Sequence, residues 1–304
     1  MGAKQIQTFA SLMMAIFMVT TLASDGADDN RKKTDKVKAP DAVMFLAPLN
    51  DAIDMNAGTL EVRFALNYSF SDYIRPDLSA CVPFRFISLL SKEGTPFSSG
   101  DSTPWLNLHF KQKRGLHTIL YGNNHHYSAP DAEPEKRNSS LGVNSDEQKG
   151  PWFKKGEWHS LAATWCIDDK DVMHLELFLD GKSYKRSSFP KKTSSLRPLA
   201  KDDLIGIGGL DVSEATLLSY RISKRVRTKE EIASDKPLTP DEATTFFLDG
   251  TTAAQCKVLK QSVFAKMVNT KTVSIKGKGV FVGTPEFVNT PKGKAIQFSA
   301  KGRP

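Results

Sequence analysis

The chain has 304 residues, of which 39% are hydrophobic and 25% charged, and it carries a formal net charge of +8. These proportions exclude a disordered polymer, a collagen and a polytopic membrane protein. The length suffices for one large domain or for two of average size, so a substantial core is expected.

The first 23 residues are typical of a secretory signal peptide. Lys4 precedes an uncharged apolar run from Phe9 to Leu22, and small residues follow it. The run is short for a bilayer span, although an uncleaved membrane anchor is the alternative. We expect cleavage after Ala23, a secreted or cell-envelope location, and a flexible leader over residues 24–40, which are rich in Asp, Lys and Arg.

Short β-strands are predicted from residue 41 onward. The clearest pattern is 59–66, where apolar residues at even positions alternate with Glu61 and Arg63, as in a half-buried strand. Apolar runs predict further strands at 43–46, 84–90, 105–110 and 116–121. The polar stretch 122–151 is predicted to be a long loop.

The strand pattern resumes at 158–165 and continues at 204–208 and 216–222. Between them, 172–179 and 182–188 flank Asp180-Gly181, which predicts a hairpin. Thr228 and Glu231 form a T-x-x-E capping box that predicts one short helix after these strands. This order predicts an all-β fold, a two-sheet antiparallel sandwich or jelly roll.

Four segments in order resemble the LamG-like branch of the concanavalin A-like lectin/glucanase superfamily. They are GTLEVRF at 58–64, GEWHSLAATW at 156–165, LELFLDGK at 175–182, and LIGIGG at 204–209 with the helix that follows. The resemblance covers residues 58–234 and implies a concanavalin A-like jelly roll over residues 41–235. Because that branch mostly serves recognition, it also implies a non-catalytic module.

The C-terminal residues 236–304 contain the two segments that such domains usually carry before their GTLE-like strand. FFLDG at 246–250 and the run 291–302 resemble these missing opening strands. The tail is either a truncated second domain or the completion of the same sandwich, and we favour completion because a half-sandwich would expose edges. Residues 257–303 hold ten Lys/Arg and one acidic residue, so the basic excess lies here.

Three cysteines are present, Cys81, Cys166 and Cys256, and export permits a disulfide. Since three cysteines cannot all pair within one chain, we expect at most one intrachain bridge, of three possible pairings. No CxxC pair occurs, which argues against a zinc site.

Residues able to contact a ligand form two groups. One comprises aromatic and imidazole side chains in or beside the long loop, namely His125, His126, Tyr127 and Trp152, which could stack on sugar rings. The other comprises basic residues before the predicted helix, namely Arg221, Lys224 and Arg225, which could meet sulfate or carboxylate groups. Local packing and a solvated surface are the competing interpretations.

Three carboxylates lie within four residues, at Asp168, Asp169 and Asp171. Carboxylates on a loop are typical ligands of calcium, so this segment is a candidate calcium site. A solvated polar turn explains them equally well. The E-x-D-x-x-E carboxylate pattern of glucanases is absent, and Glu176 and Asp180 are the nearest approach to a pair.

The favoured function is therefore a secreted module that binds a glycan, an acidic polysaccharide being one option because of the basic tail, or an extracellular protein partner. A glycoside hydrolase or lyase with an atypical carboxylate pair is an alternative, and a structural envelope protein is another. Nucleic acid is not an expected partner outside the cell, and no transmembrane span is expected after removal of the signal.

Overall fold

The computed structural model describes residues 43–49, 51–54, 56–67, 85–90, 106–113, 116–123, 140–145, 153–190, 200–208, 215–234, 237–259 and 279–298. All of these residues belong to one compact unit, Pro40–Pro304. The predicted signal peptide and leader lie outside the described residues, as does Cys81.

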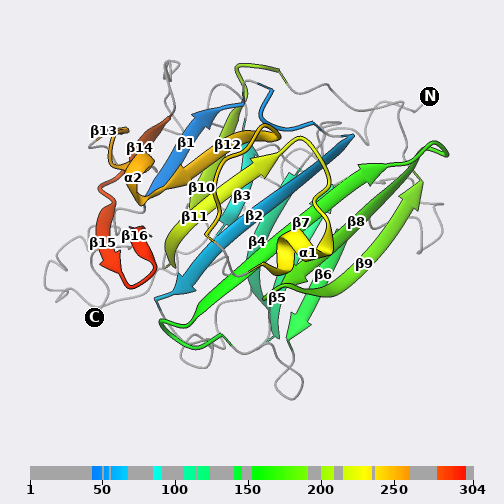
Figure 1. Ribbon diagram of the computed structural model, residues 1–304, viewed down its shortest axis with the longest axis horizontal. Helices are drawn as coiled ribbons and strands as arrows, with labels where there is room; N and C mark the ends of the chain where they lie inside the picture. The colour runs from blue at the N-terminus through cyan, green and yellow to red at the C-terminus, as the bar shows by residue number, and fades with distance from the viewer. Residues whose placement is uncertain are drawn as a thin grey trace, which may run out of the picture. The chain divides into compact units, whose positions relative to one another are not determined.

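Most described residues form two β-sheets (Figure 1). The first sheet has the order β13 (Lys257–Leu259), β14 (Val280–Val282), β1 (Met44–Pro48), β10 (Leu204–Gly208), β3 (Arg85–Leu90), β4 (Leu106–Lys113), β5 (Leu116–Asn123) and β6 (Ser140–Ser145). The second sheet has the order β15 (Glu286–Thr290), β16 (Gly293–Phe298), β11 (Ala215–Ser223), β2 (Ala57–Leu66), β7 (Trp158–Ile167), β8 (Val172–Leu179) and β9 (Lys182–Pro190).

Paired strands run antiparallel in both sheets, apart from the parallel pair β13 and β14. Only two short helices occur in the described part of the chain, α1 (Lys229–Ala233) and α2 (Gly250–Ala253). The prediction of an all-β, two-sheet jelly-roll sandwich is thus confirmed.

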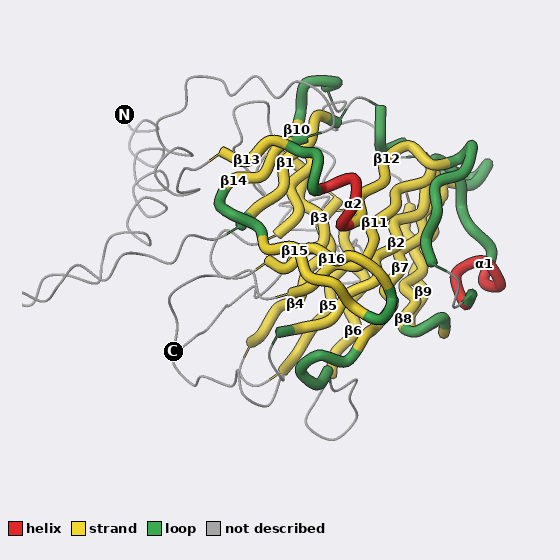
Figure 2. Tube along the Cα trace, turned by 60° about the vertical axis from the view of Figure 1, so that its left-hand side comes forward, coloured by secondary structure: helices red, strands yellow, loops and turns green. Residues whose placement is uncertain are grey.

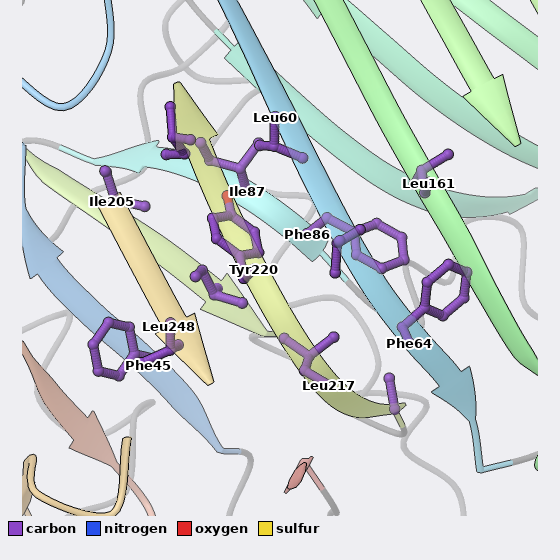
Figure 3. Packing of buried hydrophobic residues seen from close by; sticks show 14 of the residues in the cluster. Phe45, Leu60, Phe64, Phe86, Ile87, Leu161, Ile205, Leu217, Tyr220 and Leu248 are labelled. Carbon is purple, nitrogen blue, oxygen red and sulfur yellow. The ribbon is translucent and has the colours of Figure 1, made fainter. Parts of the chain in front are cut away.

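The core lies between the two sheets and explains the alternation in the sequence. Leu60, Phe64 and Leu217 of the second sheet are buried in one cluster with Phe45 and Ile205 of the first. Figure 3 shows these side chains converging from facing strands. Residues of the second sheet at intervening positions, such as Glu61, face the opposite way, and we call that side the outer face of the second sheet.

Trp165 on β7 packs fully inside this core, and its indole Nε1 donates a 2.7 Å hydrogen bond to the carbonyl of Asp54. A Cβ on Gly58 would lie 2.2 Å from the Trp165 ring, so only glycine lets the two strands approach at this point. Trp158, seven residues earlier, faces the other way and stays partly exposed.

The hairpin at Asp180-Gly181 has the geometry that the sequence predicts. Both residues adopt positive φ angles, 48° and 74°, and Leu179 pairs with Lys182. β4 extends beyond the predicted strand 105–110 to Lys113, which pairs with Leu116 at the start of β5. The prediction of a loop throughout 122–151 is wrong at residues 122–123, which end β5, and at residues 140–145, which form β6 and pair with β5.

Strands from the C-terminal region pair within both sheets (Figure 2). Along one edge of β11, β16 pairs with residues 215–217 and β12 (Thr244–Asp249) pairs with residues 219–223. In the first sheet β14 pairs with β1. Phe281, Ile296 and Phe298 from these strands are buried in the main core.

Among the helices of the described residues, none is long and apolar enough to cross a membrane. Cys166 and Cys256 are not joined to each other by a disulfide, which removes one of the three pairings considered.

Candidate functional site

The outer face of the second sheet divides into two halves. Across β11, β2 and parts of β7 and β8 it is overlaid by residues 224–234 and 237–243, which we call the covering segment and which include α1. Ile232 of α1 packs on Ala162 of β7 and Phe178 of β8, and Arg63 Nη2 donates a 2.6 Å hydrogen bond to the carbonyl of Ser234. Figure 2 shows α1 lying outside the sheet. The rest of the face, on β7, β8 and β9, we call the open half.

A buried carboxylate anchors the covered half. Glu61 of β2 accepts from Arg221 of β11, with Nη2 to Oε2 at 2.6 Å, and its Oε2 lies 3.1 Å from Nε of Arg227. Burial raises the pKa of Glu61 from its ordinary value, although Arg221 and Arg227 oppose the rise. Because one carboxylate faces two guanidinium groups, the surplus positive charge needs further partners nearby.

Acceptors from the covering segment supply those partners. Arg227 Nη2 donates to both carboxylate oxygens of Asp241 at 2.8 Å, and Arg221 Nη1 donates to the carbonyl of Thr239 at 2.7 Å. Burial raises the pKa of Asp241, but hydrogen bonds from Arg227 and Thr244 outweigh it and lower the value to about 2. The ion pairs thus tie the covering segment to the sheet.

The predicted capping box is confirmed at α1. Thr228 Oγ1 accepts from the backbone N–H of Glu231, and the Glu231 carboxylate accepts from the backbone N–H of Thr228 at 2.8 Å. Arg225 also donates to Glu231, with Nη1 to Oε2 at 2.8 Å. This contact is the main cause that lowers the pKa of Glu231 to about 2.

These contacts change the interpretation of the basic residues before the helix. Arg221 is not on the surface, because its guanidinium is buried and paired with Glu61. Arg225 is partly exposed but engaged with Glu231. Lys224 is exposed, and its backbone N–H donates to the carbonyl of Ala243. Of the three predicted ligand contacts, Arg221 is therefore buried in an ion pair that stabilises the fold, and only Lys224 and Arg225 reach the surface.

The open half carries a hydrogen-bonded chain of three side chains. Asp168 follows β7, His174 lies on β8, and Ser188 lies opposite His174 on β9. Asp168 Oδ2 is 2.9 Å from His174 Nε2, and Ser188 Oγ is 2.8 Å from His174 Nδ1. We call these three residues the Ser188 relay. Cys166 of β7 is the other cross-strand neighbour of His174.

One row further along the same strands, Glu176 of β8 gathers donors around its carboxylate. Ser183 donates to Oε1 at 2.5 Å, Arg186 Nη2 lies 3.1 Å from Oε2, and Lys229 Nζ lies 3.5 Å from Oε1. The side chains of Arg186 and Lys229 are 67% and 60% exposed, so both cations face solvent. Tyr184 of β9 is 41% exposed.

Two of the three aspartates after β7, Asp168 and Asp171, have a structural role in their turn. Asp168 Oδ1 accepts from the backbone N–H groups of Lys170 and Val172, each at 2.9 Å, and Asp171 has a positive φ of 58°. The hydrogen bond from His174, followed by that from Val172, lowers the pKa of Asp168. Over the described residues no group of three or more His, Cys, Asp or Glu side chains is arranged to hold a metal.

The two carboxylates closest to a glycosidase pair are both engaged. Glu176 has the three partners given above. Asp180 accepts from the Ser160 backbone N–H at 2.9 Å and from His159 Nδ1 at 3.0 Å. Burial raises the pKa of Asp180, but the His159 and Ser160 hydrogen bonds outweigh it, and the value is lowered. These contacts make Asp180 a turn-stabilising residue.

A small hollow lies between the covering segment and the sheet, where Glu61, Arg63, Phe178 and Ile232 are among its lining residues. It has room for little more than a water molecule. A sugar ring therefore does not fit beneath the covering segment, and the open half offers the accessible polar surface.

Four of the predicted ligand contacts, His125, His126, Tyr127 and Trp152, lie outside the described residues. Sequence reasoning missed His174 and Ser188. Their pairing could have been approached from the Asp180-Gly181 turn, because a hairpin fixes which residues face each other. Counting from this turn places Ser187 opposite His174, whereas an irregularity between Leu177 and Phe178 shifts the register to Ser188.

No protein-family model matches the chain, and no curated protein matches it. Solved structures with some likeness include a heptameric SAP-like pentraxin from Limulus polyphemus, with 11% identity, a TM-score of 0.38, and coverage of 66% of this chain and 76% of that one. A botulinum neurotoxin type C structure, described as dependent on two ganglioside molecules for cell entry, has 10% identity, a TM-score of 0.38, and coverage of 62% and 38%.

The carbohydrate recognition domain of Emp46p has 17% identity, a TM-score of 0.30, and coverage of 57% of this chain and 73% of that chain. These scores are too low to carry an argument about what this chain binds.

Proposed function

We propose that the protein is an extracytoplasmic recognition module of the LamG-like type, which binds a glycan on the open half of the outer face. The observation that carries the proposal is the row of outward-facing polar side chains on β8 and β9, in which Arg186 and Ser188 are exposed and the His174 side chain is 37% exposed. The order of the LamG-like motifs between residues 58 and 234 supports the same reading, and so does the signal-like N-terminus.

The chemistry of the open half suits sugar hydroxyl groups, which both donate and accept hydrogen bonds. Asp168 and Glu176 offer acceptors, Arg186 and Lys229 offer donors, and His174 offers either according to its protonation. An exposed aromatic ring, Tyr184, lies on the same strand as Arg186 and can stack on the apolar face of a sugar.

The two exposed cations favour an acidic polysaccharide over a neutral one. Arg186 and Lys229 both lie at Glu176, and an incoming carboxylate or sulfate can accept hydrogen bonds from their free donors. The net charge of +8 also favours an acidic polysaccharide, because it attracts a polyanion to the protein. Binding is therefore expected to weaken with salt.

We further propose that residues 236–304 complete this one sandwich and do not form a separate domain. The pairing of β12 and β16 with β11 supports this, as does the burial of Phe281 and Phe298 in the main core. Without these strands the edge of β11 would be open.

The test is a binding assay of the mature chain on a panel of acidic and neutral polysaccharides at two salt concentrations. The double variant Arg186→Ala/Lys229→Ala is compared with Lys154→Ala/Lys201→Ala, which removes the same charge from exposed side chains elsewhere, 75% and 77% exposed. We expect the first pair to weaken binding to an acidic polysaccharide at least about tenfold, since charge-assisted hydrogen bonds are lost.

Equal loss in both double variants would mean that only net charge matters and would contradict a site on the open half. Reducing ends released from the panel would instead favour the glycoside hydrolase alternative. New unsaturated ends would favour the lyase alternative.

A further inference from the structure

The Ser188 relay has the connectivity of an activated nucleophile. Ser188 Oγ is 2.8 Å from one nitrogen of His174, and the other nitrogen is 2.9 Å from Asp168. A hydroxyl, an imidazole and a carboxylate in this order form the arrangement that deprotonates serine in acyl transfer, on unrelated folds and in any chain order.

The protonation states follow from the partners. Asp168 is held as a carboxylate, since the His174 hydrogen bond and the Val172 backbone N–H lower its pKa. A carboxylate only accepts, so His174 Nε2 must donate its proton to Asp168. In the neutral ring Nδ1 is then the acceptor, and it receives the hydrogen of Ser188 Oγ. The imidazole is thus oriented as a base toward Ser188.

The carboxylate is itself fixed in place. Asp168 Oδ1 accepts two backbone N–H groups from its own turn, those of Lys170 and Val172, and this leaves Oδ2 for His174. Such support holds the base in one orientation, as a functional constellation requires.

Cys166 is the competing nucleophile beside His174, and two observations argue against it. Burial and the nearby Asp168 charge raise the pKa of the Cys166 thiol, which keeps it protonated. Both ring nitrogens of His174 already face Ser188 and Asp168. Ser188 is therefore the group that the imidazole activates.

A positive charge lies on the same side of β9. Arg186 is two residues from Ser188 on the strand, and both residues pair with outward-facing positions of β8, Glu176 and His174. With its side chain 67% exposed, Arg186 is accessible to a bound group. A guanidinium there can stabilise negative charge that develops on a carbonyl oxygen.

From this arrangement we propose that the open half hydrolyses small acyl esters, with Ser188 as nucleophile, His174 as base and Asp168 as the group that orients it. Ser188 Oγ adds to the ester carbonyl carbon while its proton passes to His174 Nδ1. The tetrahedral adduct expels the alcohol, which takes that proton and leaves an acyl group on Ser188. Water, deprotonated by the same nitrogen, releases the carboxylic acid and restores the serine.

The ester-cleaving activity does not depend on glycan binding and is assayed separately. The identity of the natural substrate, an acyl group carried on the hydroxyl of a bound sugar, rests on the proposed function. The exposed position of Ser188 favours a short acyl group such as acetyl, because a long acyl chain needs a pocket that removes it from water.

The experiment uses the full mature chain with p-nitrophenyl acetate as substrate and a fluorophosphonate as covalent probe, and locates the adduct by peptide mass spectrometry. We expect turnover and an adduct on Ser188. Ser188→Ala and His174→Gln should each lower kcat/KM at least about 100-fold, the usual contribution of a positioned base. Cys166→Ala, on the other side of His174, is the matched control and should retain both turnover and labelling.

Thermal unfolding of each variant shows whether it is folded. If Ser188→Ala fails to fold, the adduct on the unaltered chain decides alone. Absence of an adduct on Ser188, or full turnover in folded Ser188→Ala, overturns the proposal. Retained glycan binding in an inactive Ser188→Ala would leave the recognition function standing and separate the two proposals.

Discussion

The two halves of the outer face both contain ion pairs between glutamate and basic residues, but these pairs have different roles. In the covered half, Glu61 and its two arginines are almost completely removed from solvent. In the open half Glu176 is also buried, but its partners Arg186 and Lys229 keep most of their side chains exposed. Burial of both charges makes the loss of one partner costly, whereas an exposed cation exchanges easily with water or ligand. The first arrangement holds the fold, and the second is available for binding.

The largest expected effect comes from removing the residues that complete the covered half. Truncation after Asp235 deletes Asp241, the partner of Arg227, together with β12 and β16, which cover an edge of β11. We expect an insoluble or non-cooperative product. A cooperative thermal transition of residues 41–235, equal to that of the mature chain, would contradict the single-sandwich proposal.

The next effect compares the two carboxylates directly. Glu61→Gln leaves two buried guanidinium groups without their negative charge and should lower the free energy of unfolding by about 3 kcal/mol. Glu176 is also buried, but its cationic partners are exposed, so Glu176→Gln should lower the free energy of unfolding by less, about 1 kcal/mol. Urea unfolding of both variants checks this, and equal losses would remove the distinction between the halves.

A smaller effect is expected on the core side of the covered half. Tyr220 of β11 is fully buried, and its hydroxyl has no hydrogen-bond partner among the described residues. Tyr220→Phe removes an unsatisfied polar atom and should leave stability unchanged or raise it by about 1 kcal/mol. A clear loss of stability, by the same urea assay, would show that the hydroxyl has a partner in solution.

The smallest effect is a pH dependence of the ion pair between Arg227 and Asp241. Folding lowers the pKa of Asp241 from 3.8 to about 2, so its stabilising contribution is present above pH 4 and is lost as pH falls toward 2. The Asp241 side chain is 38% exposed, which keeps the contribution small. As the pH is lowered from 4 toward 2, the difference in unfolding free energy between the unaltered chain and Asp241→Asn should shrink. A difference that stays constant would exclude a stabilising ion pair between Arg227 and Asp241.

Much of the fold is readable from the sequence because local patterns dictate it. Alternation marks β2, the Asp180-Gly181 turn marks the β8–β9 hairpin, and the T-x-x-E box marks α1. β6 was missed because it has only two apolar residues, Leu141 and Val143, inside a long polar stretch, and pairing with β5 is what makes residues 140–145 a strand.

The candidate site was harder to foresee, because its residues meet through tertiary register. The sequence around Arg221 does not indicate that this side chain is buried in an ion pair with Glu61, 160 positions away. Likewise, Ser188 lies opposite His174 only because the pairing of β8 and β9 shifts by one residue. No local sequence pattern predicts such a bulge.

The most direct test of the division into halves is amide hydrogen exchange of the full mature chain with and without a bound acidic polysaccharide. We predict slower exchange on binding in residues 166–190, which contain His174, Glu176 and Arg186, and in α1, which begins at Lys229, with no change in residues 219–223 and 237–243. Protection confined to residues 219–223 and 237–243 would contradict this prediction, because the ligand would then occupy the half that the ion pairs are proposed to close.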